Sequence, residues 1–422
     1  MSGRITPLAV SLVIVVAWAV ALAVLTARPE PFVAALPLIL VLVLATRRRA
    51  PAVTVTHEVS AARVIEGEAL TITVTVQTPS SVPFVEVLDA VPAGCEAGAG
   101  RHRALLALDA GGSASLRYDL HAARGAHELG TVALRARDRW GLRAWDSVHT
   151  DRKVVRVYPR AVPLRSLPRP LRTQSSVGDY VSPALGEGIE PGDVRQFAPG
   201  DRLRLVNWRA SLRLGTLYVT QHHRERNADV VLMLDTLAQA GPAGDDTLDH
   251  SVRAVASLAT AYLARKDRVG LITYGGTIDW VRPATGRLQY ARIADTLLRA
   301  DVVFTYVSKD LAFVPPRVLP PRAMVLAVTP LLDARFATAA LDLAARGFDL
   351  AVLVVSPVDL TLRMLRGSPA ERLACRLWEL ERRAGFDRFR RHGITVMEWR
   401  PSDPLEPALA AHGRRRRPRV AG

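Results

Sequence analysis

Cysteine and lysine are both scarce in this chain of 422 residues. The two cysteines, Cys95 and Cys375, lie far apart and belong to no CxxC pair, which argues against a disulfide framework or a zinc knuckle and favours a reducing compartment. Lysine occurs only at Lys153, Lys266 and Lys309, so arginine supplies nearly all of the net charge of +16. Because these arginines are spread along the chain without interleaved aromatic residues, we do not expect nucleic-acid binding.

Enzyme signatures are also missing from the sequence. It has no GxxxxGKS/T phosphate loop, no HExxH zinc motif and no GxSxG nucleophile elbow. Gly186 and Gly188 begin a run that resembles GxGxxG, but Pro191 stands where the third glycine is needed. We therefore expect no catalytic residues and no enzyme activity, and a hydrolase whose groups converge only in the folded chain is kept as an alternative.

Two apolar runs lie near the N-terminus. Residues 5–27 contain no charge and are long enough to cross a bilayer core, which takes ~20 residues. A second uncharged run, residues 32–46, is slightly short and ends at three arginines, 47–49. With Arg4 before the first run, the positive-inside rule places both ends in the cytoplasm. We expect a hairpin of two spans over residues 1–50 in the inner (plasma) membrane, with cytoplasmic soluble domains; a cleaved signal peptide is the alternative.

Alternating apolar and polar residues dominate the next segment. The run from Leu70 to Val76 alternates with threonine, as half-buried strands do, and turn signals such as Gly111-Gly112 separate several such pieces. Short strands at this spacing predict a small all-β, immunoglobulin-like sandwich over residues 51–160. We expect it to act as a spacer or binding module.

The periodicity then changes to that of an α/β domain. Val230–Leu234 is an all-apolar strand of the kind buried on both faces of a parallel sheet, and strands and amphipathic helices alternate after it. We expect a doubly wound α/β domain over residues 227–402. In such sheets ligands bind at the carboxyl ends of the strands, which points to the loops after Leu234 and Val328.

Residues 161–226 are expected to form a linker followed by a charged segment. Pro199-Gly200 supplies a tight turn, and both charge signs occur around it. Trp208 has apolar neighbours in sequence, and we expect it to be a buried anchor on the sheet. An ordered connection held by ion pairs is the plainest interpretation of this segment.

The charged segment resembles the signature of the domain-of-unknown-function family 58. In that family an Arg, a Pro-Gly-Asp turn, an Arg, an Asn/Asp-Trp pair and a Glu lead into a von Willebrand factor A-like domain. The matching residues here are Arg195, Pro199, Gly200, Asp201, Arg204, Asn207, Trp208 and Glu225. The turn from Asp138 to Leu142 is similar to the end of the family's sandwich, and the paired N-terminal spans fit as well.

The resemblance also implies where a metal would bind. Domains of the von Willebrand factor A type often hold Mg²⁺ at a DxSxS loop, with a threonine and an aspartate from later loops. Asp235 keeps the first position, but Leu237 and Gln239 replace both serines. Thr329 and Asp333 could supply part of a degenerate site. We expect no cofactor and negligible Mg²⁺ binding, because hard cations need oxygen ligands.

The tail, residues 403–422, is rich in arginine and is expected to be disordered. Members of the resembled family often occur alongside MoxR-type AAA+ ATPases, which implies work in the assembly or remodelling of complexes. We therefore expect a protein-interaction scaffold tethered to the lipid bilayer, with such an ATPase as its partner. The alternatives are an Mg²⁺-dependent adhesion-type binder and the hydrolase named above.

Overall fold

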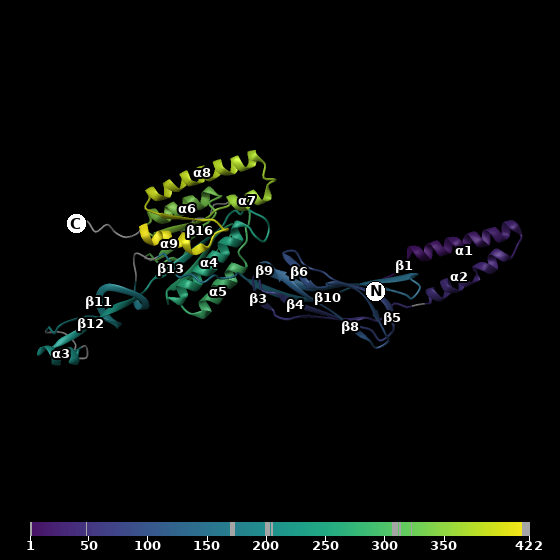
Figure 1. Cartoon of the computed structure of the whole chain (residues 1–422), viewed down its shortest axis with the longest axis horizontal. Helices are drawn as coiled ribbons and strands as arrows, with labels where there is room; N and C mark the ends of the chain where they lie inside the picture. The colour runs from purple at the N-terminus through teal and green to yellow at the C-terminus, as the bar shows by residue number, and fades with distance from the viewer. Residues whose placement is uncertain are drawn as a thin grey trace. The chain divides into compact units, whose positions relative to one another are not determined.

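The computed structural model divides the chain into two compact units, Met1–Tyr158 and Pro159–Gly422, whose elements are labelled in Figure 1. The division lies close to residue 160, the expected end of the β-rich segment. The described residues are 2–47, 49–168, 174–198, 203, 206–305, 311, 314–321 and 323–415, with the backbone alone for 2, 174–193, 220–227 and 411–415.

The first unit begins with two apolar helices that lie side by side, α1 (Pro7–Thr26) and α2 (Glu30–Thr46). Thr6 caps α1 by accepting a hydrogen bond from the amide of Ala9 at 3.4 Å. Within the described residues, α1 is the one helix long and apolar enough to cross a membrane, and α2 is a shorter apolar helix of 17 residues. The N-terminal apolar helix indicates that the chain is anchored in a membrane.

The rest of the first unit is mostly β. Its two sheets have the strand orders β1-β10-β9-β5-β7, with β3 paired to β10, and β2-β4-β8-β6. The strands are β1 (Ser2–Ile5), β2 (Thr54–Val59), β3 (Arg63–Ile65), β4 (Leu70–Gln77), β5 (Val82–Asp89), β6 (Cys95–Gly100), β7 (Arg103–Leu108), β8 (Ser113–Ala122), β9 (Gly125–Arg137) and β10 (Arg143–Tyr158). Alternate residues of β4, β5 and β9 point into one shared core, so the two sheets form a sandwich.

The turn between β9 and β10 joins the sandwich to the helix pair. Leu142 is 1% exposed and packs with Ala9 of α1 and Ala45 of α2. The hydroxyl of Thr6 donates to the carbonyl of Gly141 at 2.7 Å. Arg143 Nη1 donates to the carbonyl of Thr46 at 3.1 Å. The sandwich is therefore bonded to the end of the helix pair at which α1 begins and α2 ends.

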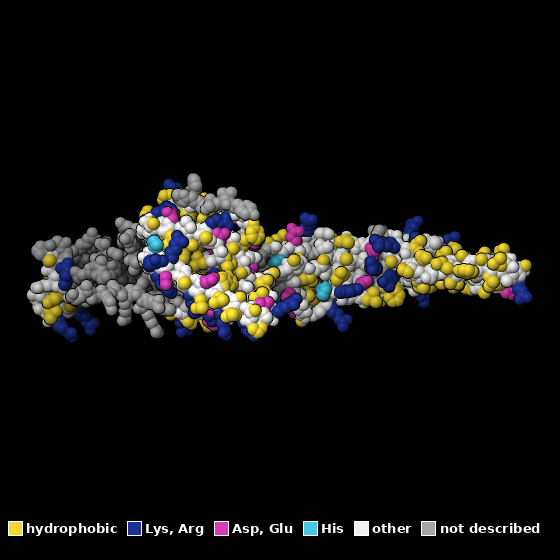
Figure 2. Space-filling view, turned by 90° about the horizontal axis from the view of Figure 1, so that it is seen from above, with side chains coloured by type: hydrophobic (Ala, Val, Ile, Leu, Met, Phe, Trp, Pro, Cys, Tyr) yellow, Lys and Arg dark blue, Asp and Glu magenta, His cyan; other side chains and the backbone are white. Residues whose placement is uncertain are grey.

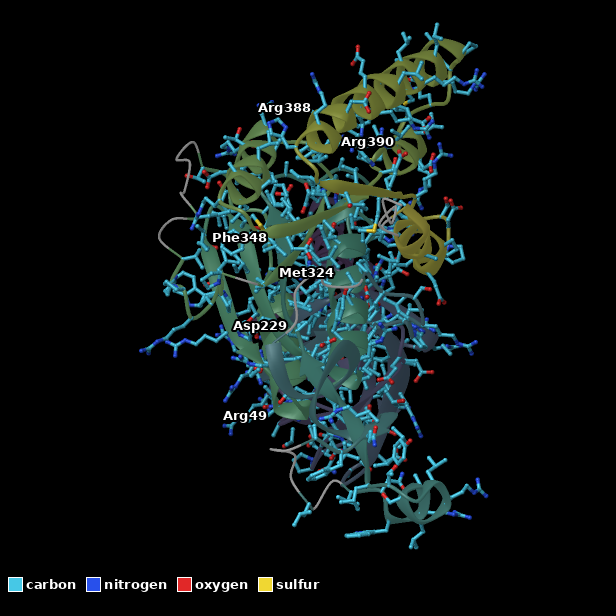
Figure 3. All side chains as sticks on the ribbon, turned by 90° about the vertical axis from the view of Figure 1, so that its left-hand side faces the viewer. Arg49, Asp229, Met324, Phe348, Arg388 and Arg390 are labelled. Atoms are coloured by element: carbon cyan, nitrogen blue, oxygen red, sulfur yellow. The ribbon has the colours of Figure 1, made fainter. Side chains whose placement is uncertain are left out.

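The second unit contains a six-stranded sheet in the order β15-β14-β13-β16-β17-β18, parallel except for β15. The strands are β13 (Asp229–Thr236), β14 (Arg268–Gly275), β15 (Ile278–Ala284), β16 (Met324–Thr329), β17 (Asp349–Val355) and β18 (Thr395–Trp399). Figure 3 labels Asp229 and Met324, the first residues of the two central strands and hence markers of the amino edge of the sheet. The carboxyl edge lies at the opposite ends of these strands.

Helices cover both faces of this sheet. The helices are α4 (Thr247–Ala264), α5 (Arg287–Leu298), α6 (Ala334–Ala345), α7 (Val358–Met364), α8 (Pro369–Arg391) and α9 (Leu405–Arg415). Buried residues of α4, α5 and α9 share a core with Val230 and Leu232, and those of α6 and α8 share another with Val231 and Met233. The residues of β13 thus alternate between two apolar layers, and the expected α/β domain is confirmed.

Two expectations about the flanking segments were wrong. The segment expected to be a linker contains an antiparallel pair, β11 (Gln174–Gln196) and β12 (Tyr218–Asn227), with the helix α3 (Trp208–Leu214) between them in sequence. The segment expected to be a disordered tail contains α9, in which Leu405 and Leu409 are buried against the sheet, and its last residues, 416–422, lie outside the described residues. Two apolar residues four apart on one helical face are enough to dock a helix that is otherwise polar.

Candidate functional site

Three of the side chains proposed from the sequence lie at the carboxyl edge of the parallel sheet. Asp235 is near the end of β13 and Thr329 ends β16, and the two strands pair in register up to Leu234 and Val328. Asp333 follows on the loop after β16 and caps α6. The parallel arrangement therefore brings together residues that are almost a hundred positions apart.

The carboxyl group of Asp235 is buried, and each of its oxygens accepts a hydrogen bond from the protein. Thr329 Oγ1 donates to its Oδ2 at 2.5 Å, and the amide of Leu237 donates to its Oδ1 at 2.9 Å. The residue is only 1% exposed. Burial raises its pKa to about 7, although these two hydrogen bonds favour the charged form. The buried carboxyl group of Asp235 thus links the ends of β13 and β16 through a hydrogen bond.

Asp333 is neutralised by Arg335, a residue that the sequence interpretation missed. Arg335 Nη2 lies 2.6 Å from Asp333 Oδ2, and Nε contacts both carboxylate oxygens at 3.0 and 3.1 Å. This hydrogen-bonded guanidinium holds the pKa of Asp333 below its usual value. Arg335 Nη1 also donates to the carbonyl of Thr305 at 2.6 Å, which ties the loop after α5 to the edge.

These contacts do not suit a divalent metal. Leu237 is buried and offers no side-chain oxygen, and Gln239 is exposed. The carboxylate of Asp333 is paired with a guanidinium that carries the positive charge at this position. Among the described residues, no group of three or more His, Cys, Asp or Glu side chains is arranged to hold a metal ion. The residues present therefore do not fit the Mg²⁺ that the resemblance implies.

The loop after α5 lies over the same edge and presents an apolar side chain. A β-carbon on Gly276, just after β14, would collide with the carbonyl of Val303, so the loop approaches the sheet closely where only glycine fits. The next residue, Phe304, is 92% exposed. Protein interfaces are enriched in aromatic residues, and Phe304 is an exposed aromatic side chain in a loop that is held by hydrogen bonds.

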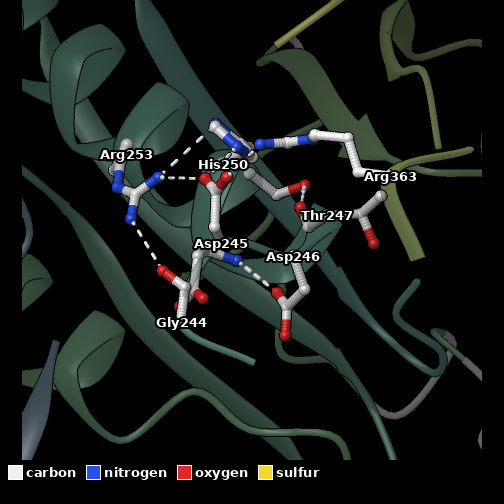
Figure 4. Close-up of polar contacts among 9 residues, drawn as sticks. Gly244, Asp245, Asp246, Thr247, His250, Arg253 and Arg363 are labelled. Atoms are coloured by element: carbon white, nitrogen blue, oxygen red, sulfur yellow. Dashed lines mark hydrogen bonds and ion pairs between the residues drawn. The ribbon is translucent and has the colours of Figure 1, made fainter. Parts of the chain in front are cut away.

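A second polar group follows the first strand of the edge, in the segment that leads into α4 (Figure 4). Asp245 contacts His250 Nε2 at 2.8 Å and Arg363 Nη1 at 2.8 Å. Burial opposes it, but the hydrogen bond from Arg363 and the charges of His250 and Arg253 lower the pKa of Asp245. Asp246 caps α4 by accepting from the amide of Asp249 at 2.9 Å. These contacts hold α7 against the start of α4 and order the edge.

The signature residues are only partly described. Arg195 lies in β11 and donates to the carbonyl of Gln196 at 3.0 Å. Asn207 caps α3 by accepting from the amide of Ala210 at 3.0 Å. Pro199, Gly200, Asp201 and Arg204 lie outside the described residues, as does the side chain of Glu225.

Trp208 is not the buried anchor that we expected. It is 61% exposed, and Leu212, one helical turn later, is 84% exposed. α3 is held instead through the buried Ser211, whose Oγ accepts from the amide of Tyr218 at 2.8 Å. Side chains four residues apart share a face of a helix, so Trp208 and Leu212 point outward together.

Part of the chain is similar to a family of known proteins. Residues 193–366 match the family model described as "Protein of unknown function DUF58". This DUF58 region contains the carboxyl-edge residues described above. Uncharacterised proteins of Mycobacterium tuberculosis and Mycobacterium bovis are 29% identical to the chain over 138 residues, which is 32% of this chain and 44% of each relative. The matched part is thus less than half the length of these relatives.

Proposed function

We propose that this chain is a membrane-anchored scaffold, with a DUF58 region of the von Willebrand factor A type that docks a MoxR-type AAA+ ATPase in the cytoplasm. The docking surface is the carboxyl edge of the parallel sheet, formed by the loop around Phe304, the Asp333–Arg335 pair and the Asp245 group. The work of such a scaffold is the assembly or remodelling of protein complexes.

The observation that carries the proposal is the Asp333–Arg335 pair, in which Arg335 is also bonded to Thr305, the residue after the exposed Phe304. The guanidinium supplies internally the positive charge that a metal supplies in adhesion-type domains. The edge is therefore pre-organised without a metal, and pre-organisation reduces the entropy lost on binding. The tie from Arg335 to Thr305 fixes the residue next to Phe304 in the same way.

The anchor is proposed to be a hairpin with two crossings. β1 pairs with β10, so the residues before α1 belong to the sandwich. A chain that starts and continues on one side of a bilayer must cross it an even number of times, and α2 supplies the return. At 1.5 Å per residue, the 17 residues of α2 span about 25 Å, slightly less than the ~30 Å core.

The cytoplasmic orientation rests on Arg4 and on the arginines after α2, which border the hairpin on its sandwich side. Reporter fusions placed after Arg49 and at the C-terminus are expected to report the cytoplasm in both cases. An extracytoplasmic signal from either fusion would overturn the orientation, and from the C-terminal fusion it would also contradict docking of an ATPase in the cytoplasm.

The carboxyl edge supports the two competing functions, Mg²⁺-dependent adhesion and hydrolysis, less well than it supports docking. Mg²⁺-dependent adhesion needs an aspartate free to face a metal, whereas Asp333 is bonded to Arg335. A hydrolase needs an activated nucleophile, and the ring of His250 contacts Asp245, Arg253 and Trp399 instead of a hydroxyl or thiol.

Binding of the purified ATPase to the full chain in nanodiscs tests the proposal. Phe304→Asp should weaken binding by ~30-fold or more, the loss of an interface hot spot. Leu288→Asp is the matched control, because Leu288 is 67% exposed at the start of α5, at the opposite edge of the same sheet. Absence of binding, or equal losses in both variants, would contradict the proposed docking surface.

A further inference from the structure

The outer face of the sandwich carries a shallow basic pocket of about 520 Å³ on β5, β7 and β9. Its lining includes Phe84, Arg101, Arg103, Leu105, Arg135 and Arg137. The alternation along each strand places these side chains, except that of Arg101, which precedes β7, on the side opposite the core. The pocket therefore belongs to the solvent face of the sheet and is independent of the carboxyl edge of the DUF58 region.

Positive charge dominates this pocket. Glu86 is its one acidic lining residue, and it pairs with Arg103 at 2.5 Å. Arg135 pairs with Asp146 of β10 at 2.8 Å. The exposed side chains of Arg101 and Arg137 have no acidic partner among the described residues. Two guanidinium groups are thus available to a ligand with negative charge.

The pocket also offers apolar surface next to these charges. Phe84 is 44% exposed and Leu105 is 68% exposed. Phe84 lies directly opposite Arg137 in the pairing of β5 with β9, so an aromatic ring and a guanidinium stand side by side. A ligand that fits this lining has an anionic group and an adjoining apolar part.

One side of the pocket, formed by Phe84 and Arg137, lies at the end of the sandwich that is bonded to the apolar helices. Arg137 is followed directly by Asp138, which accepts a hydrogen bond from the amide of Arg143 at 2.9 Å within the β9–β10 turn. That turn packs on α1 and α2 through Leu142. Arg135 is two residues back along β9, or ~7 Å. In Figure 2, Lys and Arg side chains gather on the sandwich next to the yellow helix pair.

We propose that this pocket binds the headgroup of an anionic phospholipid, with Arg137 on the phosphate, Arg101 adding positive charge that attracts the headgroup, and Phe84 and Leu105 against the glycerol and upper acyl region. A lipid is favoured over an acidic protein because the pocket adjoins the helices proposed to cross the bilayer. An anionic headgroup at the membrane surface lies at that level. The inference rests on the proposed membrane location and gives the sandwich a specific role there.

Native mass spectrometry of the full chain in a neutral maltoside detergent tests this inference, with phosphatidylglycerol and phosphatidylcholine as probes. Wild type should bind phosphatidylglycerol more tightly. The double variant Arg101→Gln/Arg137→Gln should lose about 25-fold in affinity, about fivefold for each arginine. The charge-preserving variant Arg101→Lys/Arg137→Lys should retain most of the binding, which separates loss of charge from misfolding.

The control is Arg117→Gln/Arg152→Gln, two exposed arginines of the same sandwich outside the pocket, which should bind as wild type does. Equal binding of the two lipids, or an unchanged affinity in the pocket variant, would refute the proposal. Displacement of the lipid by millimolar inorganic phosphate or by an acidic peptide would likewise refute it, assigning the pocket to a soluble anion or a protein. Carbonate extraction of membranes tests the anchoring separately, since an unanchored chain would appear in the soluble fraction.

Discussion

Thr329 donates its hydroxyl to Asp235, with Oγ1 2.5 Å from Oδ2, and this hydrogen bond joins the ends of the two central strands. Beside it, the carboxylate of Asp333 is paired with the guanidinium of Arg335. The carboxyl edge is thus closed by its own hydrogen bonds.

The buried carboxyl group of Asp235 should make stability depend on pH. Burial raises its pKa from 3.8 to about 7. The stability that the protonated carboxyl group contributes to the folded state is therefore fully present below about pH 4 and is lost as the pH rises through 7. Asp235→Asn cannot ionise. The free energy of unfolding of this variant, relative to wild type, should therefore rise by about 2–3 kcal/mol between pH 5 and pH 8. Denaturant unfolding at the two pH values measures this difference, and a constant difference would contradict it.

The wild-type chain should bind Mg²⁺ and Mn²⁺ negligibly. The position of one serine ligand is taken by Leu237, and Asp333 is bonded to Arg335. Isothermal titration calorimetry with millimolar metal should show no saturable heat, with a chelator-treated sample as the control. Stoichiometric binding that is abolished by Asp235→Ala would show that the site is intact after all.

Trp208→Ala should change the free energy of unfolding by only about 0.5 kcal/mol or less, because surface substitutions away from special features have small effects. The ring is 61% exposed. The matched comparison is Phe336→Ala, which empties a fully buried aromatic position in the same unit and should cost about 3–5 kcal/mol. Thermal melting distinguishes them. Similar large losses in both would mean that Trp208 is buried in solution.

Much of the α/β fold follows from the sequence because its strands are apolar on both faces. The run Val230–Leu234 predicts β13, which the structure extends by one residue at the start and two at the end. The amphipathic helices expected to alternate with the strands are present as well, among them α6. The spacing of apolar residues in buried strands and amphipathic helices reflects which of their faces are buried, so these elements are recognised without knowledge of tertiary contacts.

The parts that could not be predicted depend on contacts between distant residues. Arg335 has the local signature of an ordinary helical arginine, and its role appears only when the loop at Thr305 is placed beside it. Trp208 was misjudged for a related reason. Its apolar neighbours in sequence suggested burial, but the sequence does not tell which face of a seven-residue helix meets β12.

The docking claim is tested most directly by photo-crosslinking in living cells. A photoreactive phenylalanine analogue at position 304 lies on the carboxyl edge, and the same analogue at position 288 lies at the opposite edge of the sheet. We predict that position 304 crosslinks to a MoxR-type AAA+ ATPase and that position 288 does not. No crosslink to such an ATPase at position 304, or equal crosslinking from both positions, would contradict docking at the carboxyl edge.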